Sequence, residues 1–199
     1  EEGAILAQAI SAQALGARGE HHAASMATYS VELRVQIRGG EEGVVKIEVH
    51  PEWSPVGAAH FKELVEMGFY NQARFHRVLQ GFIAQVGIAA DPELYNKYGT
   101  NRIKDDPVKQ QNVRGMVTFA KRGEPDSRSC QFFFNTVDNT RLDADGFAPF
   151  AKVVSGMEFI DMLQVTEGVD QQALKEEGNK YLDKFFPGKV SEILEAKVV

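Results

Sequence analysis

The sequence predicts a mainly β protein, built as an antiparallel barrel or sandwich that helices cover. Between residues 75 and 154, short apolar runs follow one another with turn residues between them and without intervening helices. Earlier in the chain, apolar residues alternate with polar ones at a period of two, which is typical of half-buried strands. These observations exclude a doubly wound α/β sheet, in which a helix separates successive strands.

The first two strands are expected to form a hairpin. Residues 29–36 carry an apolar side chain at every second position, and residues 44–49 form a second β-rich run. Gly39 and Gly40 lie between the two runs, and a glycine pair at that place indicates a turn.

A helix is predicted to follow this hairpin and to cover the sheet. Ser54 is the expected N-cap and Pro55 the first helical residue, and Gly68 marks the end. The apolar residues of this segment are spaced for one buried face and comprise Ala58, Phe61, Leu64 and Val65.

The remaining elements follow from the same patterns. Further strands are predicted over residues 75–79, 82–86, 116–120, 131–136 and 149–154. Helices are predicted over residues 157–163 and 171–186, and a final strand over residues 193–199. Residues 88–114 are predicted to be a long loop, and a loop of that length is expected to have a packing or functional role.

Composition bounds the class of protein. The 199 residues are 43% hydrophobic and 25% charged, which is typical of a globular chain with a sizeable core. The net charge of -6 gives no indication of nucleic-acid binding. Cys130 is the only cysteine, so an internal disulfide and a zinc site of several thiolates are both excluded. No apolar run reaches the roughly 18 to 20 residues of a membrane-spanning helix. The sequence does not identify the compartment, and we expect a soluble protein that is cytoplasmic, or organellar after processing.

The chain is expected to divide into an N-terminal arm, residues 1–28, and one domain, residues 29–199. The arm is rich in Ala and Gln, and Leu6, Ile10 and Ala14 would form a thin apolar stripe on a helix. Such a helix is marginal alone. The arm is therefore either a frayed tail or a helix that docks on a partner surface.

Two segments carry residues suited to chemistry. Arg77 is a cation within an apolar strand, and Gln85 and Ile83 are expected to share one face of the next strand. Arg77 could form a site with them or lie at the rim with its charge in water. In the second segment, Phe133 must point away from its neighbours Phe132 and Phe134, so one face fills the core while the other can line a pocket. Apart from the doublet His21-His22, the histidines have no spacing typical of a metal site.

Several motifs in order resemble the cyclophilin family of peptidyl-prolyl cis-trans isomerases. The resemblance runs from about Tyr29 to Leu163, and residues 177–187 resemble those of members with an added C-terminal helix and strand. The motifs are Phe75-His76-Arg77-Val78, Gly81 to Gly87, Gly115 to Ala120, Ser129 to Phe134, Leu142-Asp143 and Phe147 to Val153.

The resemblance implies a closed eight-stranded antiparallel barrel capped by helices. It also implies isomerisation of Xaa-Pro bonds in proline-containing peptides and proteins, without a cofactor or metal, in folding or conformational switching. Arg77 matches the catalytic arginine of the family. The implied substrate-binding residues are Phe82, Ile83, Gln85, Ala120, Lys121, Gln131, Phe132, Phe133, Arg141, Leu142 and Phe147.

The chain departs from the family pattern at the edge of this site. Arg141 stands where many members have Trp, Phe147 where His or an aromatic residue is usual, and Lys121 where Asn is expected. The Trp-to-Arg change predicts weak binding of cyclosporin-type inhibitors. Lys121 and Arg122 make the edge more basic, which would favour acidic peptides. An alternative hypothesis is a catalytically weak binding subunit that docks in a larger assembly through the arm.

Overall fold

The structure, a computed structural model, describes residues 27–37 and 40–199. The predicted arm, residues 1–28, therefore lies outside the described residues except at its very end. Gly39 of the predicted turn lies outside them as well. The division of the chain into an arm and a domain stays a prediction.

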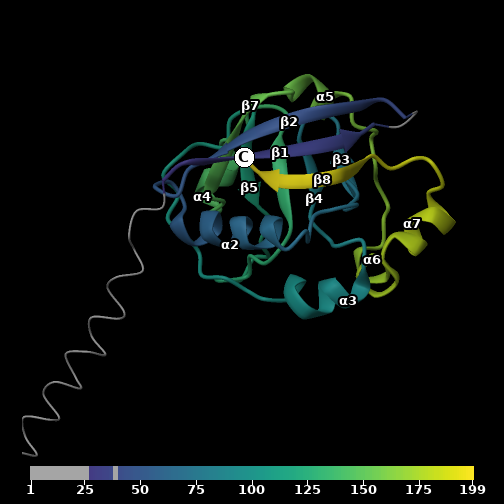
Figure 1. Cartoon of the computed structure of the whole chain (residues 1–199). Coiled ribbons are helices and arrows are strands. Elements are labelled where there is room, and N and C mark those ends of the chain that lie inside the picture. The colour runs from purple at the N-terminus through teal and green to yellow at the C-terminus, as the bar shows by residue number, and fades with distance from the viewer. Residues whose placement is uncertain (1–26, 38–39) are drawn as a thin grey trace, which may run out of the picture.

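One curled antiparallel sheet of eight strands forms the body of the protein (Figure 1). The strands are β1 (Tyr29–Gln36), β2 (Glu42–Val49), β3 (Arg77–Leu79), β4 (Ile83–Val86), β5 (Met116–Phe119), β6 (Phe132–Asn135), β7 (Pro149–Ser155) and β8 (Glu192–Val198). Their order across the sheet is β3-β4-β6-β5-β7-β2-β1-β8, and each neighbouring pair is antiparallel. The mainly β prediction and the positions of the strands are confirmed.

The sheet is curled like a half-barrel, so its two edge strands, β3 and β8, approach each other. An isolated bridge joins Arg74 to Glu192 next to these edges. The Phe75 N–H donates to the Ser191 carbonyl over 2.9 Å, and the Ile193 N–H donates to the Ala73 carbonyl over 2.8 Å. No ladder pairs β3 with β8 in the described chain, so the sheet itself is an open, curled one.

Helices cover the sheet and its ends (Figure 1). They are α2 (Pro55–Glu66), α3 (Pro92–Leu94) with the π-helical turn η2 (Tyr95–Gly99), α4 (Arg141–Ala144), α5 (Met157–Asp161), α6 (Gln171–Glu177) and α7 (Asn179–Phe185). The predicted hairpin is confirmed by the pairing of β1 with β2 from Tyr29↔Val49 to Gln36↔Glu42. The loop predicted over residues 88–114 contains the short helical segment α3–η2.

Helix α2 lies against the inner face of the sheet, as predicted, but its N-terminus is capped differently. The Ser54 hydroxyl makes no capping bond to the helix and donates instead to Asp106, over 2.5 Å. The Asp106 carboxylate accepts the N–H groups of Val56 and Gly57, over 3.1 and 2.9 Å. The cap therefore comes from about 50 residues further along the chain, which no local sequence pattern could reveal.

The C-terminal region corrects two predictions. The single helix over residues 171–186 is two helices, because Gly178 interrupts it with φ +63° and approaches Ala90 so closely that a Cβ there would lie 2.2 Å from the Ala90 carbonyl oxygen. The final strand is also no addition to the sheet. It is one of the eight strands, β8, and pairs with β1.

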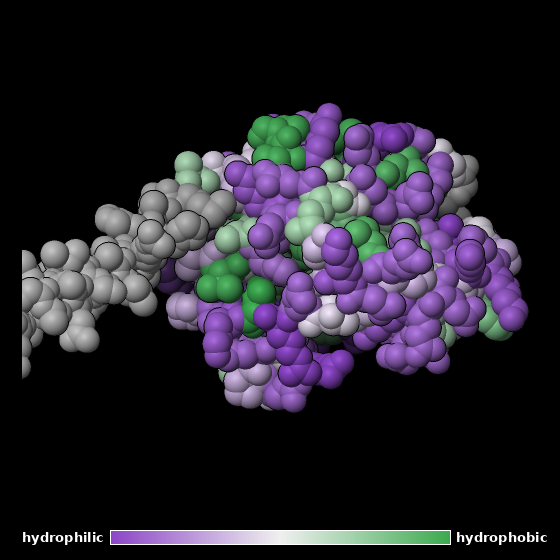
Figure 2. All heavy atoms as spheres, turned by 60° about the horizontal axis from the view of Figure 1, so that its bottom comes forward, coloured by the Kyte–Doolittle hydropathy of each residue, from purple (hydrophilic) through white to green (hydrophobic). Residues whose placement is uncertain are grey.

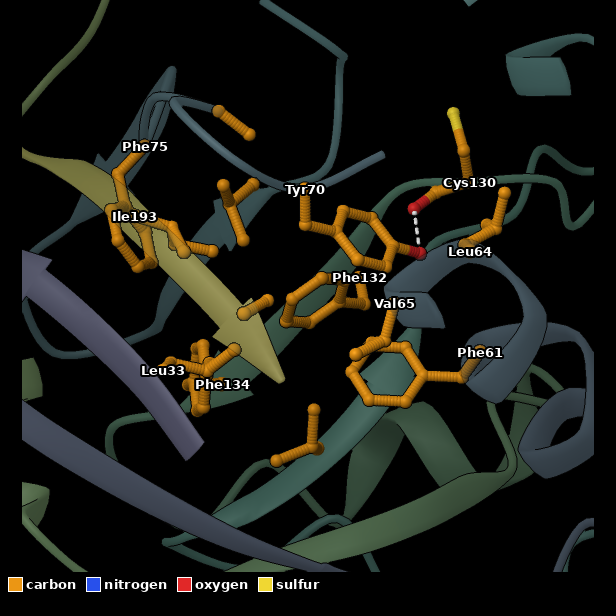
Figure 3. Packing of buried hydrophobic residues seen from close by; sticks show 14 of the residues in the cluster. Leu33, Phe61, Leu64, Val65, Tyr70, Phe75, Cys130, Phe132, Phe134 and Ile193 are labelled. Atoms are coloured by element: carbon orange, nitrogen blue, oxygen red, sulfur yellow. Dashed lines mark hydrogen bonds between the residues drawn. The ribbon is translucent and has the colours of Figure 1, made fainter. Parts of the chain in front are cut away.

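Two apolar clusters lie on opposite sides of the sheet. The main core is inside the curl and holds Phe61, Tyr70, Phe132 and Phe134, whose rings pack edge-on (Figure 3). The second cluster is small and is built around Phe133. Alternation along β6 therefore sends neighbouring phenylalanines to different sides, as predicted.

The surface shown in Figure 2 is mostly hydrophilic, with apolar residues in separate small groups. Within residues 27–37 and 40–199, no helix combines the length and the hydropathy needed to span a membrane.

Candidate active site

Three neighbouring strands place Arg77, Gln85 and Phe133 in one row. Arg77 pairs with Gln85 across β3 and β4, and Gln85 pairs with Phe133 across β4 and β6. The Arg77 guanidinium donates from Nη1 to Gln85 Oε1 over 3.2 Å and is half-buried. The register thus brings a fixed cation, an amide and an aromatic ring to the same side of the sheet.

A chain of neutral side chains holds the row in position. The Gln85 amide donates from Nε2 to Gln131 Oε1 over 2.8 Å, and His76 Nε2 lies 3.1 Å from the same oxygen. Both contacts use the Gln131 carbonyl oxygen. Its amide nitrogen therefore remains the group with which Gln131 can bind a peptide carbonyl.

His76 acts in this chain as a neutral donor. Complete burial is the main cause that lowers its pKa to about 4, against the bond to Gln131, which raises it. The imidazole is therefore uncharged at neutral pH, and Nε2 is the donor of this bond because the Gln131 carbonyl oxygen can only accept. This positioning role was missed at the sequence level, where His76 stands only as a member of the motif Phe75-His76-Arg77-Val78; its place beside Arg77 was the available signal.

Gly87 allows the end of β4 to pass close to the segment that carries Gln131. Its φ is +112°, and a Cβ at this position would lie 2.5 Å from the Cys130 carbonyl oxygen and 2.9 Å from Gln131 Cα. Only glycine fits both the backbone conformation and this approach. Gly87 therefore contributes to the position of Gln131.

The apolar cluster beside the row forms a second part of the site. Ile83, Phe133 and Leu142 are its buried members, and Phe82, Ala120 and Phe147 pack against them with part of their surface exposed. The Phe133 and Phe147 ring centroids are 6.0 Å apart, at an interplanar angle of 67°. Ile83 and Gln85 lie on one face, as predicted, so an apolar surface and a polar row adjoin.

Cations surround the partly exposed rings of this cluster. The guanidinium carbons of Arg77 and Arg141 lie 6.0 and 4.7 Å from the Phe82 ring centroid. Lys121 Nζ lies 5.9 Å from the Phe147 ring centroid. Each distance is within cation–π range. The structure thus brings Arg141 and Lys121 to the rim of the cluster.

Phe132 is the one predicted binding residue that lies away from this surface. Its side chain has no exposed area and contacts Phe61, Tyr70 and Phe134 in the main core. Its assignment to substrate contact disagrees with this position, because strand alternation gives the exposed side of β6 to Phe133.

Cys130 is unsuited to nucleophilic chemistry although it precedes Gln131. Burial raises the pKa of its thiol to about 12, so the thiol is protonated at neutral pH. The Cys130 carbonyl accepts a bond of 2.9 Å from the Tyr70 hydroxyl (Figure 3). In the part of the chain that the structure describes, no group of three or more His, Cys, Asp or Glu side chains could hold a metal ion.

A polar hollow of about 410 Å³ adjoins the row and shares Gln85, Ala120, Lys121 and Gln131 with the site. Its far wall includes Gln171 and Lys175 of α6. Sequence analysis did not connect α6 with the site, since about 40 residues separate it from Gln131 and no motif links them.

Comparison with known proteins identifies the family. A family model described as cyclophilin type peptidyl-prolyl cis-trans isomerase/CLD matches residues 33–179. The chain is 32% identical over 144 residues to the peptidyl-prolyl cis-trans isomerase of Acinetobacter baylyi, covering 70% of this chain and 73% of that protein. It is 32% identical over 130 residues to peptidyl-prolyl cis-trans isomerase B of Escherichia coli, covering 61% and 79%.

A solved structure supports the fold. The crystal structure of a Cryptosporidium parvum cyclophilin type peptidyl-prolyl cis-trans isomerase matches with a TM-score of 0.65 and 21% identity, covering 87% of this chain and 98% of that one. Sequence and structure agree, and the chain belongs to the cyclophilin-type peptidyl-prolyl cis-trans isomerase family.

Proposed function

We propose that this cyclophilin-type peptidyl-prolyl isomerase works through Arg77, which stabilises the twisted state of an Xaa-Pro bond. Amide resonance opposes rotation with a barrier of about 18–20 kcal/mol. In the twisted state this resonance is lost, and the proline nitrogen regains a lone pair that can accept a hydrogen bond. A donor placed at that nitrogen therefore stabilises the twisted state more than either planar isomer.

The observation that carries this role is the way in which Arg77 is held. Its hydrogen bond goes to the neutral Gln85 amide, and no carboxylate forms an ion pair with it among the residues that the structure describes. The guanidinium is thus fixed in direction while its charge and other N–H groups stay available to a substrate.

The apolar cluster is the proposed site for the proline ring. Ile83, Phe133 and Leu142 would form its floor, and a buried apolar surface of this kind favours a ring without polar groups. Gln131 would donate to a backbone carbonyl beside the proline. The rim would be formed by the remaining predicted residues, namely Phe82, Ala120, Lys121, Arg141 and Phe147, with Gln85 holding Arg77.

The test is the cis-to-trans relaxation of a short Xaa-Pro peptide, which takes tens to hundreds of seconds without catalyst. Arg77→Ala is expected to reduce kcat/KM about 100- to 1,000-fold while the protein stays folded. Arg77→Lys, which keeps the charge but loses the forked geometry, should retain only part of the activity. Wild-type activity in Arg77→Ala would contradict the assignment.

Failure of the folded wild-type protein to accelerate several Xaa-Pro peptides would reject catalysis altogether. The binding-subunit hypothesis would then stand, in which residues 1–28 dock in a larger assembly. Pull-down with and without these residues would test that role directly.

We further infer that the curled sheet is a closed barrel in solution. The backbone bonds of Phe75 and Ile193 across the edges support this inference. Hydrogen exchange at these two amides should be as slow as in the central strands β5 and β6. Rapid exchange at both amides would indicate an open edge.

A further inference from the structure

The polar hollow beside the proposed proline pocket is lined by positive charge. Four of its lining side chains are cations, Arg102, Lys121, Arg122 and Lys175. The lining residues, all of them in the described part of the chain, include no aspartate and no glutamate. The net charge of the protein is -6, so the charge of the hollow is opposite in sign to that of the whole chain.

Two of the four cations have a carboxylate partner outside the hollow. Arg102 pairs with Glu124 over 2.9 Å, and Lys121 pairs with Asp105 over 3.4 Å. Arg122 and Lys175 form no ion pair within residues 27–37 and 40–199. Their charges are therefore available to a bound anion.

Lys175 is held at the hollow by its helix and by an aromatic ring. Helix α6 begins at a cap in which the Asp170 carboxylate accepts the N–H groups of Gln172 and Ala173. One turn later, Lys175 Nζ lies 5.9 Å from the Tyr95 ring centroid. These contacts direct an amine into a hollow that three further cations line.

The positive field reaches groups around the hollow. The charge of Lys175 contributes to lowering the pKa of His76 and opposes the rise in the pKa of Cys130, in both cases as a smaller effect than burial. The charge of Arg122 likewise opposes the burial that raises the pKa of Tyr95 to about 12. Each of these smaller contributions has the sign expected near a positive charge, although burial sets the direction of the whole shift.

The hollow and the proposed proline pocket are continuous. Ala120 packs against the apolar cluster and also lines the hollow, and Gln85, which pairs with Phe133 of the cluster, lines the hollow as well. An extended peptide advances by about 3.3 Å per residue. A side chain within about three residues of the bound proline can therefore enter the hollow.

We propose that this hollow binds an anionic side chain, a carboxylate or a phosphomonoester, of the peptide whose proline occupies the apolar cluster. The inference rests on the proposed function of the Arg77 site and adds its substrate class. Acidic residues near the proline would be preferred because Arg122 and Lys175 provide unpaired charge at a partly enclosed polar wall.

The test compares Xaa-Pro peptides that differ at one position. One series carries Gln, Glu, phosphoserine or Lys two or three residues before the proline, and a second series carries them after it. In one of the series, kcat/KM is expected to be about 3- to 10-fold higher for Glu than for Gln, higher again for phosphoserine, and lowest for Lys. The preference should shrink at about 0.5 M salt, where charges are screened over a few ångströms.

The double variant Arg122→Gln/Lys175→Gln should lose this preference. The matched control, Lys184→Gln/Lys189→Gln, removes the same charge from exposed C-terminal positions that do not line the hollow. It should keep the preference, which separates a local site from the overall field. Equal loss in both double variants would overturn the assignment to the hollow.

The two proposals fail in different ways. Catalysis of neutral peptides without any acidic preference in either series would overturn the anion site and leave the isomerase site standing. If no peptide is accelerated, titration of the same peptides by isothermal calorimetry decides the anion site alone: tighter binding of the acidic peptides supports it, and equal binding rejects it.

Discussion

Arg77 and Arg128 differ in whether carboxylates compensate their charge. The Arg128 side chain is 1% exposed and lies against two carboxylates, with Nη2 3.0 Å from Asp106 and Nε 3.4 Å from Asp105. It also donates to the Ser54 hydroxyl over 3.4 Å and to the Lys104 carbonyl. This cation joins the cap of α2 to the long loop.

Arg77, in contrast, is half-buried and is held by a neutral amide. A buried charge that carboxylates compensate belongs to the fold, because removing either partner leaves the other unpaired. A charge that is oriented by a neutral side chain is not compensated, so it can still attract a ligand. The difference fits a structural role for Arg128 and the proposed functional role for Arg77.

The largest expected effect is on stability, from Arg128→Met. The substitution leaves Asp106 buried without its cation, and the free energy of unfolding is expected to fall by about 3–5 kcal/mol. Urea unfolding at pH 7 measures it. Arg114→Met is the matched control, since Arg114 forms an exposed ion pair with Asp161 over 2.6 Å and should cost at most about 1 kcal/mol.

Arg77→Ala in the same unfolding assay sharpens the contrast. Its free energy of unfolding should change by no more than about 1 kcal/mol, because no buried carboxylate in the described part of the chain pairs with Arg77. A loss as large as that of Arg128→Met would mean that Arg77 is a structural residue and would remove the distinction drawn between the two.

Phe132 and Phe133 repeat the contrast between adjacent residues. Phe132→Ala removes a ring from the main core and should lower the free energy of unfolding by about 3–5 kcal/mol. Phe133→Ala should act mainly on KM for Xaa-Pro peptides, since Phe133 lies in the small cluster beside Gln85. Urea unfolding and peptide kinetics on both variants measure the two effects, and equal loss of peptide binding would contradict the assignment of β6 faces.

The sequence predicted the strands, the hairpin and α2 because period-two and helical spacing are local signals. It could not predict that Asp106 caps α2 or that α6 lines the hollow, because long-range contacts leave no trace in a local pattern. Motif resemblance pointed to Arg77, Gln85 and Gln131, and the structure brings them together. It did not separate Phe132 from Phe133 among the proposed binding residues, although alternation along the strand allowed that separation.

The fourth prediction concerns the pH dependence of stability through His76, whose pKa burial lowers from 6.5 to about 4. The unfolded chain takes up a proton below pH 6.5, whereas the folded protein does so only near pH 4. The stability contributed by the neutral imidazole is thus complete above pH 6.5 and is lost as the pH falls toward 4, by about 2–3 kcal/mol between pH 7 and 4.5.

Replacement of the imidazole tests this dependence. His76→Gln keeps a neutral donor for Gln131 and should flatten the dependence measured by urea unfolding from pH 7 to 4.5. The same slope in both proteins would show that other groups cause the acid sensitivity. Activity of the folded variant at pH 7 should stay close to that of the wild type if the amide replaces the Nε2 donor.

The smallest effect is expected at Arg141, which touches the site only from its rim. Its guanidinium lies 4.7 Å from the Phe82 ring centroid and is exposed, so Arg141→Ala should change KM by about 2- to 5-fold at most. Arg141→Trp would instead add a broad apolar surface with one N–H donor beside Phe82. We expect weak inhibition of the wild-type protein by cyclosporin and stronger inhibition of Arg141→Trp, measured in the peptide assay. Equally strong inhibition of both proteins would show that Arg77 and the apolar cluster determine inhibitor binding by themselves. The side chain at position 141 would then contribute nothing to inhibitor binding.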